Sequence, residues 1–241
     1  AFPALTFDVT VKVEHVLAHE ELWDEMAGAG CLFVVSAFES ATDAILARLD
    51  KGHTVEDARR AVRVLRDAGI EPRPSLLPFT PWTTADDVWA LLDLIAASDL
   101  VGNVDPVHYA IRLLVPPGSL LLDSGDLNGL LGGYDHEHLG WQWRSRDPRL
   151  DALQARLSAL AQEIGATWDP AAVYEAVRST SADVLDDPAR RPAPPVDPTL
   201  RSALAVDARP RLTEAWFCCA EPTDSQLVAA RGDVTAPAGG R

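Results

Sequence analysis

Polar residues able to bind a ligand follow a short apolar segment near residue 35. Residues 32–35 (Leu-Phe-Val-Val) are β-branched, aromatic or leucine, which is typical of a strand covered on both faces. Ser36 and the pair Glu39-Ser40 come at the end of this expected strand, and Lys51 follows Glu39 after twelve residues. In parallel α/β folds ligands bind at the carboxyl edge of the sheet, because the loops there vary while the strands hold them in place. The chemistry predicted here is therefore ligand binding by a carboxylate at a strand end.

Two helices and a second strand must position these residues. Residues 42–49 form the first expected helix. Thr54 and Asp57 are an aspartate-bearing form of the capping box, and they open a second helix that Gly69 ends. Residues 70–78 (Ile-Glu-Pro-Arg-Pro-Ser-Leu-Leu-Pro) supply the next expected strand, so the pattern is a strand-helix-helix-strand crossover with parallel strands.

Residues 5–17 alternate between apolar and polar types, and this period of two predicts a strand. Glu14 comes near the carboxyl end of its polar face. The pattern leaves two interpretations open, a ligand-facing polar edge or a solvated edge strand whose charges discourage pairing. Cys31 opens the following strand at its amino end, where we expect a small buried hydrophobic residue.

Residues 31–84 resemble the second half of a radical SAM core. The resemblance rests on three matched segments: Glu39-Ser40, Lys51-Gly52-His53-Thr54-x-Glu56-Asp57 and Ala68-Gly69-Ile70. It implies an α/β fold, a partial (βα)6 TIM-like radical SAM barrel of which about four βα units are present, followed by a C-terminal helical extension and a tail.

The same resemblance implies roles for several residues in binding S-adenosylmethionine (SAM). Glu39 matches the position that hydrogen-bonds the SAM ribose, and Lys51 the position of a basic residue directed toward the carboxylate. Ser75 occupies a strand position that some relatives fill with a ribose-binding aspartate, and Glu14 a position near the SAM amino group. Ser36, at the same strand end as Glu39, is a further candidate.

The chain departs from this pattern after Pro78, where the family has Gly-x-Pro-Gly-Glu-Thr and this sequence has Phe-Thr-Pro-Trp-Thr-Thr. Trp82 either covers a pocket or packs in the core. A fourth strand is expected over residues 104–115, with Tyr109 and Arg112 as substrate-binding candidates. Arg112 is either offered to a substrate acid or paired with a buried carboxylate, and the cost of a lone buried charge favours the pair.

The composition over residues 123–146 predicts a long functional loop rich in Gly, Asp, His and Trp. His136 and His138 could ligate a metal, but without a spaced third ligand a surface location is favoured. Aromatic residues of this loop could instead form a substrate wall. Two helices are expected to begin at Asp147-Pro148 and Asp169-Pro170.

The C-terminal tail contains the adjacent cysteines Cys218 and Cys219, followed by Ala-Glu-Pro. A vicinal disulfide is strained and easily reduced, and a dithiol can chelate a soft metal. The segment resembles the tail of the CUAEP/CCAEP-tail radical SAM proteins, which implies redox reactivity or soft-metal binding at Cys219. The expected divisions are 1–122 for the second part of the barrel, 123–185 for the loop and helical extension, 186–200 for a Pro-rich linker, and 201–241 for the tail, whose end has the composition of a disordered terminus.

Composition limits the class of protein. The 241 residues are 47% hydrophobic and 24% charged, which is typical of a globular chain with a sizeable core. A net charge of -15 disfavours nucleic-acid binding, since a polyphosphate would be repelled. No apolar run is long enough to cross a membrane, and three cysteines without framework spacing favour the cytoplasm.

The predicted function is that of a radical SAM enzyme acting on a small-molecule or peptide substrate, with an electron donor such as flavodoxin or ferredoxin. In this family a Cys-x3-Cys-x2-Cys loop holds a 4Fe-4S cluster, and SAM cleavage yields a 5'-deoxyadenosyl radical. The cysteines here are 31, 218 and 219, so we expect the cluster loop upstream of Ala1. Two alternatives are a thiol or selenol metal-binding or redox carrier on a catalytically silent barrel, and a tRNA-modifying relative, which the acidity disfavours.

Overall fold

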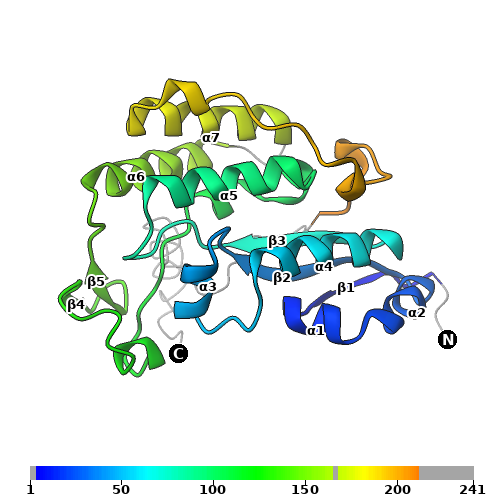
Figure 1. Ribbon diagram of the computed structural model, residues 1–241, viewed down its shortest axis with the longest axis horizontal. Helices are drawn as coiled ribbons and strands as arrows, with labels where there is room; N and C mark the ends of the chain where they lie inside the picture. Colours follow the sequence, from blue (N-terminus) through cyan, green and yellow to red (C-terminus); the bar gives the residue numbers. More distant parts are fainter. Residues whose placement is uncertain (1–3, 165–167, 212–241) are drawn as a thin grey trace, which may run out of the picture.

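The computed structural model describes residues 4–164 and 168–211, and its central element is a parallel β-sheet (Figure 1). The sheet has the order β1-β2-β3, and its strands are β1 (Phe7–Thr10), β2 (Cys31–Glu39) and β3 (Glu71–Leu76). Both neighbouring pairs are parallel, which places all three carboxyl ends at one edge. This arrangement confirms an α/β fold with helical crossovers.

Short helices join the strands. The first connection contains α1 (Val13–Ala18), η1 (Glu20–Leu22) and α2 (Trp23–Gly28), and the second contains α3 (Asp43–Arg48) and α4 (Val55–Asp67). Helix α5 (Ala85–Ala97) follows β3. The expected capping box at Thr54 is present, and α5 begins with another at Thr84; each threonine exchanges hydrogen bonds with the aspartate three residues on. These local signals therefore set the starts of α4 and α5.

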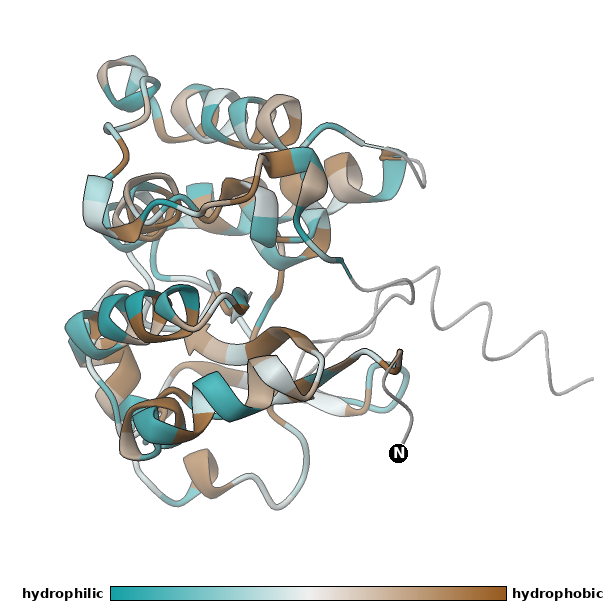
Figure 2. Ribbon diagram, turned by 90° about the vertical axis from the view of Figure 1, so that its right-hand side faces the viewer, coloured by the Kyte–Doolittle hydropathy of each residue, from teal (hydrophilic) through white to brown (hydrophobic). Residues whose placement is uncertain are grey.

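The core forms where α4 packs on the sheet. Ala58, Ala61, Val62 and Leu65 on α4 are fully buried, as is Val34 on β2. Burying a valine or leucine side chain contributes about 1.5–3 kcal/mol, so this stripe is a main source of stability for the crossover. Figure 2 shows that hydrophobic and hydrophilic colours alternate along the helices, as expected for helices with one face in the core and one in solvent. Cys31 is 3% exposed, as expected for a small buried residue.

The expected strand over residues 5–17 is shorter than its alternation indicated. Only Phe7–Thr10 is strand, and residues from Val13 to Ala18 form α1. Val13 and Val16, three residues apart, are both fully buried, so the helical spacing of apolar residues prevails there over the period of two.

The expected fourth strand over residues 104–115 is wrong. Its first half forms η3 (Pro106–Tyr109), where proline fixes φ and lacks the N–H that a strand ladder needs. Arg112, near the end of this segment, forms an isolated parallel bridge with Phe79, just after β3. The described part of the chain therefore has three parallel strands where four were predicted.

The later residues form a hairpin and two long helices. After η2 (Val101–Asn103) and η4 (Leu120–Leu122), the stretch predicted as a loop contains an antiparallel pair, β4 (Leu131–Asp135) and β5 (Gly140–Trp143). Helices α6 (Pro148–Glu163) and α7 (Pro170–Leu185) follow, each opened by the expected Asp-Pro pair. They lie beside α5 on one side of the sheet (Figure 1). None of the helices in residues 4–164 and 168–211 is long and apolar enough to cross a membrane.

Three short helical turns complete the described chain: η5 (Pro188–Arg190), η6 (Pro198–Leu200) and η7 (Val206–Ala208). Arg178 on α7 donates hydrogen bonds to the carbonyl oxygens of Arg190, Arg191 and Pro192, which fixes the proline-rich segment against the helices. We refer to residues 198–211 as the C-terminal strap.

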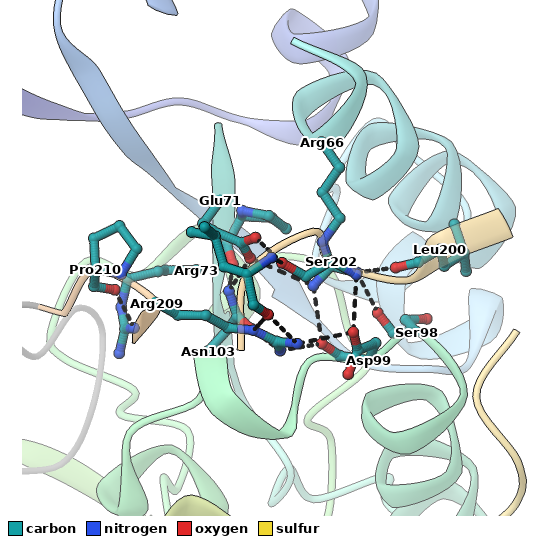
Figure 3. Close-up of polar contacts among 12 residues, drawn as sticks. Arg66, Glu71, Arg73, Ser98, Asp99, Asn103, Leu200, Ser202, Arg209 and Pro210 are labelled. Carbon is teal, nitrogen blue, oxygen red and sulfur yellow. Dashed lines mark hydrogen bonds and ion pairs between the residues drawn. The ribbon is translucent and has the colours of Figure 1, made fainter. Parts of the chain in front are cut away.

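Buried arginines hold the strap against the amino end of β3 (Figure 3). Arg209 donates to the Asp99 carboxylate and to the side-chain oxygen of Asn103, both at 2.8 Å. Arg66 donates to the carbonyl oxygens of Asp99, at 2.8 Å, and of Leu200. Such charge-assisted bonds satisfy the backbone oxygens of the strap, so the strap is part of the folded body.

Candidate cofactor-binding site

Glu39 ends β2 in a backbone conformation unusual for its residue type. Its φ is +59°, in the left-handed region that costs a non-glycine residue about 1–2 kcal/mol. The register between β2 and β3 shifts between Ala37 and Glu39, and the Glu39 carbonyl accepts the Leu77 N–H at 2.8 Å. The irregularity turns Glu39 out of the regular alternation at the carboxyl edge of the sheet.

Lys51 forms an ion pair with Glu39. Its Nζ lies 2.6 Å from the Glu39 Oε1, and the side chains are 27% and 10% exposed, respectively. Lys51 is placed by the end of α3, where its N–H donates to the Leu46 carbonyl at 3.1 Å. The two residues that the crossover was expected to bring together are therefore in contact.

Glu14 reaches the same place from α1. Gly52 has φ +70°, and a Cβ atom added to it would lie 2.4 Å from the Glu14 Oε2. Glu14 also pairs with Lys12 at 3.2 Å, on a partly exposed surface. Its carboxylate thus lies beside the Lys51-Gly52 peptide, although it comes from a helix and not from the predicted strand end.

The two serine candidates lie on opposite faces of the sheet. Ser36 lies opposite Pro74, whereas Ser75 lies opposite Ala37, and side chains alternate between faces along a strand. Ser36 is fully buried on the face of Val34, which packs in the core, and its hydroxyl has no hydrogen-bond partner among the described residues. Glu39, Lys51 and Glu14 are brought together, but Ser36 and Ser75 are not brought to one face.

Two histidines near the carboxyl edge were not among the predicted site residues. His53 is 9% exposed; its Nδ1 lies 3.2 Å from the Lys51 carbonyl, and its buried Nε2 has no partner in the described part. The sequence signal that could have identified His53 is its position in the Lys-Gly-His-Thr segment. His108 accepts the Leu76 N–H at 3.4 Å, and burial lowers its pKa to about 4. Only the fold could show that His108 caps the end of β3.

Of the three substrate candidates, Arg112 and Trp82 have polar partners within the protein, whereas the buried Tyr109 hydroxyl has none among the described residues. Arg112 pairs with Asp151 at 2.9 Å and stacks on Trp143, 3.6 Å from the ring centroid. The pairing with a carboxylate is confirmed, but the Asp151 side chain is 31% exposed and not buried. Tyr109 is buried, and burial raises its pKa well above the usual value. Trp82 is 9% exposed and donates to the Asp126 carbonyl at 3.0 Å.

The metal-ligand candidates divide into two groups. Cys218 and Cys219 lie outside the described residues. His138 hydrogen-bonds Asp135 through Nδ1 at 2.9 Å, while His136 packs edge-on against Tyr134. Hydrogen bonds from His138 and Glu137 hold the pKa of Asp135 well below its usual range. In residues 4–164 and 168–211, no group of three His, Cys, Asp or Glu side chains is arranged to hold a metal ion.

These features define an α/β protein with a charged cluster at the carboxyl edge of a parallel sheet, and its fold is similar to that of radical SAM enzymes. One similar structure is the cobalamin-dependent S-adenosylmethionine radical enzyme OxsB with aqua-cobalamin bound, with a TM-score of 0.55 and 15% identity over 63% of this chain. For OxsB with aqua-cobalamin and S-adenosylmethionine bound, the TM-score is 0.54 and the sequence identity is 16% over 66% of this chain. For the archaeal Methanocaldococcus infernus Elp3 with an N-terminal deletion, the TM-score is 0.44 and the sequence identity is 16%, over 63% of this chain and 32% of that chain.

This similarity covers only 28% of either OxsB chain. The sequence matches no protein-family model, and no curated protein matches it. The likeness therefore concerns the fold of one part of those enzymes.

The described residues differ in how they fit the two cofactors of radical SAM enzymes. A carboxylate and an ammonium group at one strand end suit the hydroxyl and carboxylate groups of SAM. A 4Fe-4S cluster needs several thiolates, and Cys31, the cysteine of the described part, is buried with its Sγ 3.6 Å from the Phe33 carbonyl. These residues therefore fit SAM and do not fit the cluster.

Proposed function

We propose that this chain is the part of a radical SAM enzyme that binds S-adenosylmethionine at the carboxyl edge of the sheet. The observation that carries the proposal is the Glu39–Lys51 ion pair of 2.6 Å, located at a strand end in a fold similar to that of OxsB. The cluster ligands would belong to another part of the enzyme. Its substrate, a small molecule or a peptide, and an electron donor such as flavodoxin or ferredoxin would complete the system.

Each charged residue of the site would have a separate role. Glu39 would accept hydrogen bonds from the ribose hydroxyls, and the hydrogen bond from Lys51 orients its carboxylate. Lys51 is 27% exposed, so its ammonium would turn toward the SAM carboxylate while staying near Glu39. Glu14, beside Gly52, would attract the cationic end of the ligand. Ser75 would add a hydroxyl on the face of Ala37, whereas Ser36 would act only from the opposite face.

SAM binding by the whole chain tests this proposal, measured by isothermal titration calorimetry. Glu39→Gln keeps the shape and one hydrogen bond to Lys51 but removes the charge. Hydrogen bonds to a charged group contribute about 1.5–3 kcal/mol, so we expect affinity to fall roughly 10- to 100-fold. Lys51→Met should weaken binding as well.

Glu20→Gln is the matched control, because Glu20 pairs with Arg60 on the surface, away from the strand end. It should bind SAM as the parent does. A Glu39→Gln variant with parental affinity would refute the site, and thermal melts of each variant separate lost binding from lost folding.

A further inference from the structure

A groove lies between the β4–β5 hairpin and the start of α6. It has a volume of about 910 Å³, and its walls combine apolar and aromatic side chains, such as Leu131 and Trp141, with the charged side chains of Arg112, Arg144, Asp135 and Asp151. Asp135 is engaged by the Glu137 and His138 N–H groups. Arg112 is neutralised by Asp151, whereas Arg144 is exposed and has no acidic partner among residues 4–164 and 168–211. The groove therefore suits an occupant with both apolar and acidic side chains.

The groove borders the carboxyl side of the sheet. The parallel bridge between Phe79 and Arg112 continues the sheet just beyond β3, and the Trp141 N–H donates to the Val115 carbonyl at 2.8 Å. Trp82, in the loop after β3, donates a hydrogen bond to the carbonyl oxygen of Asp126, which precedes β4 in the sequence. The groove is thus on the side of the sheet that carries Glu39.

The described chain ends at a fixed point at the other end of α6. Arg73 donates to the Pro210 carbonyl at 2.9 Å, and the Arg209 contacts secure the residue before it (Figure 3). The Arg211 guanidinium then lies over the Trp168 ring, 4.5 Å from its centroid. Trp168 follows the end of α6 in the sequence, whereas Pro148, at the start of α6, lines the groove. The 16 residues of α6 correspond to a length of about 24 Å, which is the distance that we expect between Trp168 and the groove.

The residues that follow Arg211 match the groove in length and chemistry. Cys218 is seven residues beyond Arg211, and an extended chain of that length reaches about 23 Å. The segment 212–222 carries Trp216 and Phe217 between two glutamates, and it has no basic residue. Its apolar centre suits the Leu and Trp walls, and its acidic ends suit Arg144.

We propose that residues 212–222 of this chain dock in the groove between the β4–β5 hairpin and α6. The strap sets the starting point, α6 sets the distance, and the groove supplies the complementary surface. Docking brings Cys218 and Cys219 to the carboxyl side of the sheet. The inference rests on the groove and the strap, and it does not depend on SAM binding.

Disulfide trapping in the full chain tests the docking. Cys218→Ser leaves one thiol in the tail, and Gln142→Cys adds an exposed thiol in the groove wall. The matched control carries Glu175→Cys in its place, an exposed position on α7 that is near Trp168 in the sequence. A docked segment raises the local thiol concentration, so under mild oxidation the Gln142→Cys protein should form its intramolecular disulfide about tenfold or more faster than the control.

Charge reversal supplies a second measurement. Arg144→Glu should slow trapping at position 142, whereas Arg144→Lys should preserve it, and both should melt as the parent does because the side chain is exposed. Equal trapping at positions 142 and 175 would overturn the proposal. Trapping only between two molecules would overturn it too, because a second copy would then occupy the groove.

Discussion

Replacing Gly52 with alanine perturbs the turn that presents Lys51, and its cost can be worked out from two features. The left-handed φ of +70° costs an alanine about 1–2 kcal/mol. The new Cβ would also lie 2.4 Å from the Glu14 Oε2, although the carboxylate is the flexible end of its side chain and can move away. We therefore expect Gly52→Ala to lower the free energy of unfolding by about 1–2 kcal/mol, nearly all of it from the backbone.

Urea denaturation measures this loss, and in a thermal melt each kcal/mol corresponds to about 2–4 °C for a chain of this size. Gly52→Asn is the matched variant, because asparagine tolerates the left-handed region better while carrying the same Cβ atom. Glu14→Ala removes the contact without touching the backbone. Because the backbone causes nearly all of the cost, Gly52→Ala should cost about the same in the Glu14→Ala background. Gly52→Ala with parental stability would refute the left-handed turn, and a cost that disappears in the Glu14→Ala background would show that the side-chain contact causes it.

Two further predictions concern pH and helix capping. Burial lowers the pKa of His108 to about 4, so between pH 6.5 and 4 the unfolded chain binds a proton that the folded chain does not, and stability falls as the pH is lowered through this window. The loss of unfolding free energy should reach about 3 kcal/mol. In urea denaturation between pH 7 and pH 4.5, the unfolding free energy of His108→Asn should fall less steeply than that of the parent. Parallel curves for the two proteins would contradict this. Thr84→Ala should cost about 1 kcal/mol by breaking the capping box of α5, and the same substitution at Thr6, an exposed position ahead of β1, should cost far less by the same measurement.

Local sequence signals were enough to predict the crossover that carries the site. The Thr-x-x-Asp pairs that begin α4 and α5 act within one helical turn, and the structure has both capping boxes. The Glu39–Lys51 contact also follows from the crossover, because α3 returns the chain to the end of the strand it left.

Contacts between distant residues account for what could not be predicted. Residues 104–115 alternate as a strand does, but His108 turns inward to accept the Leu76 N–H, and Asp105 pairs with Arg73 at 2.6 Å. These partners are 32 residues away, so no local period reveals them. In the same way, Glu14 reaches the site through a helix whose short apolar pattern overlaps that of the preceding strand.

The strap gives this protein an order of assembly. Ser202 hydrogen-bonds Glu71 across 131 residues, and the Leu200 and Pro210 carbonyls supply partners for Arg66 and Arg73. During synthesis the sheet and its crossovers emerge long before residue 200, so the buried charges at the amino end of β3 remain only partly compensated until the strap arrives. Closing so long a loop costs conformational entropy before its contacts form. The last described segment thus completes the fold that the first segments begin, and a nascent chain lacking it would leave Arg66, Glu71 and Arg73 without the hydrogen-bond partners that the strap supplies.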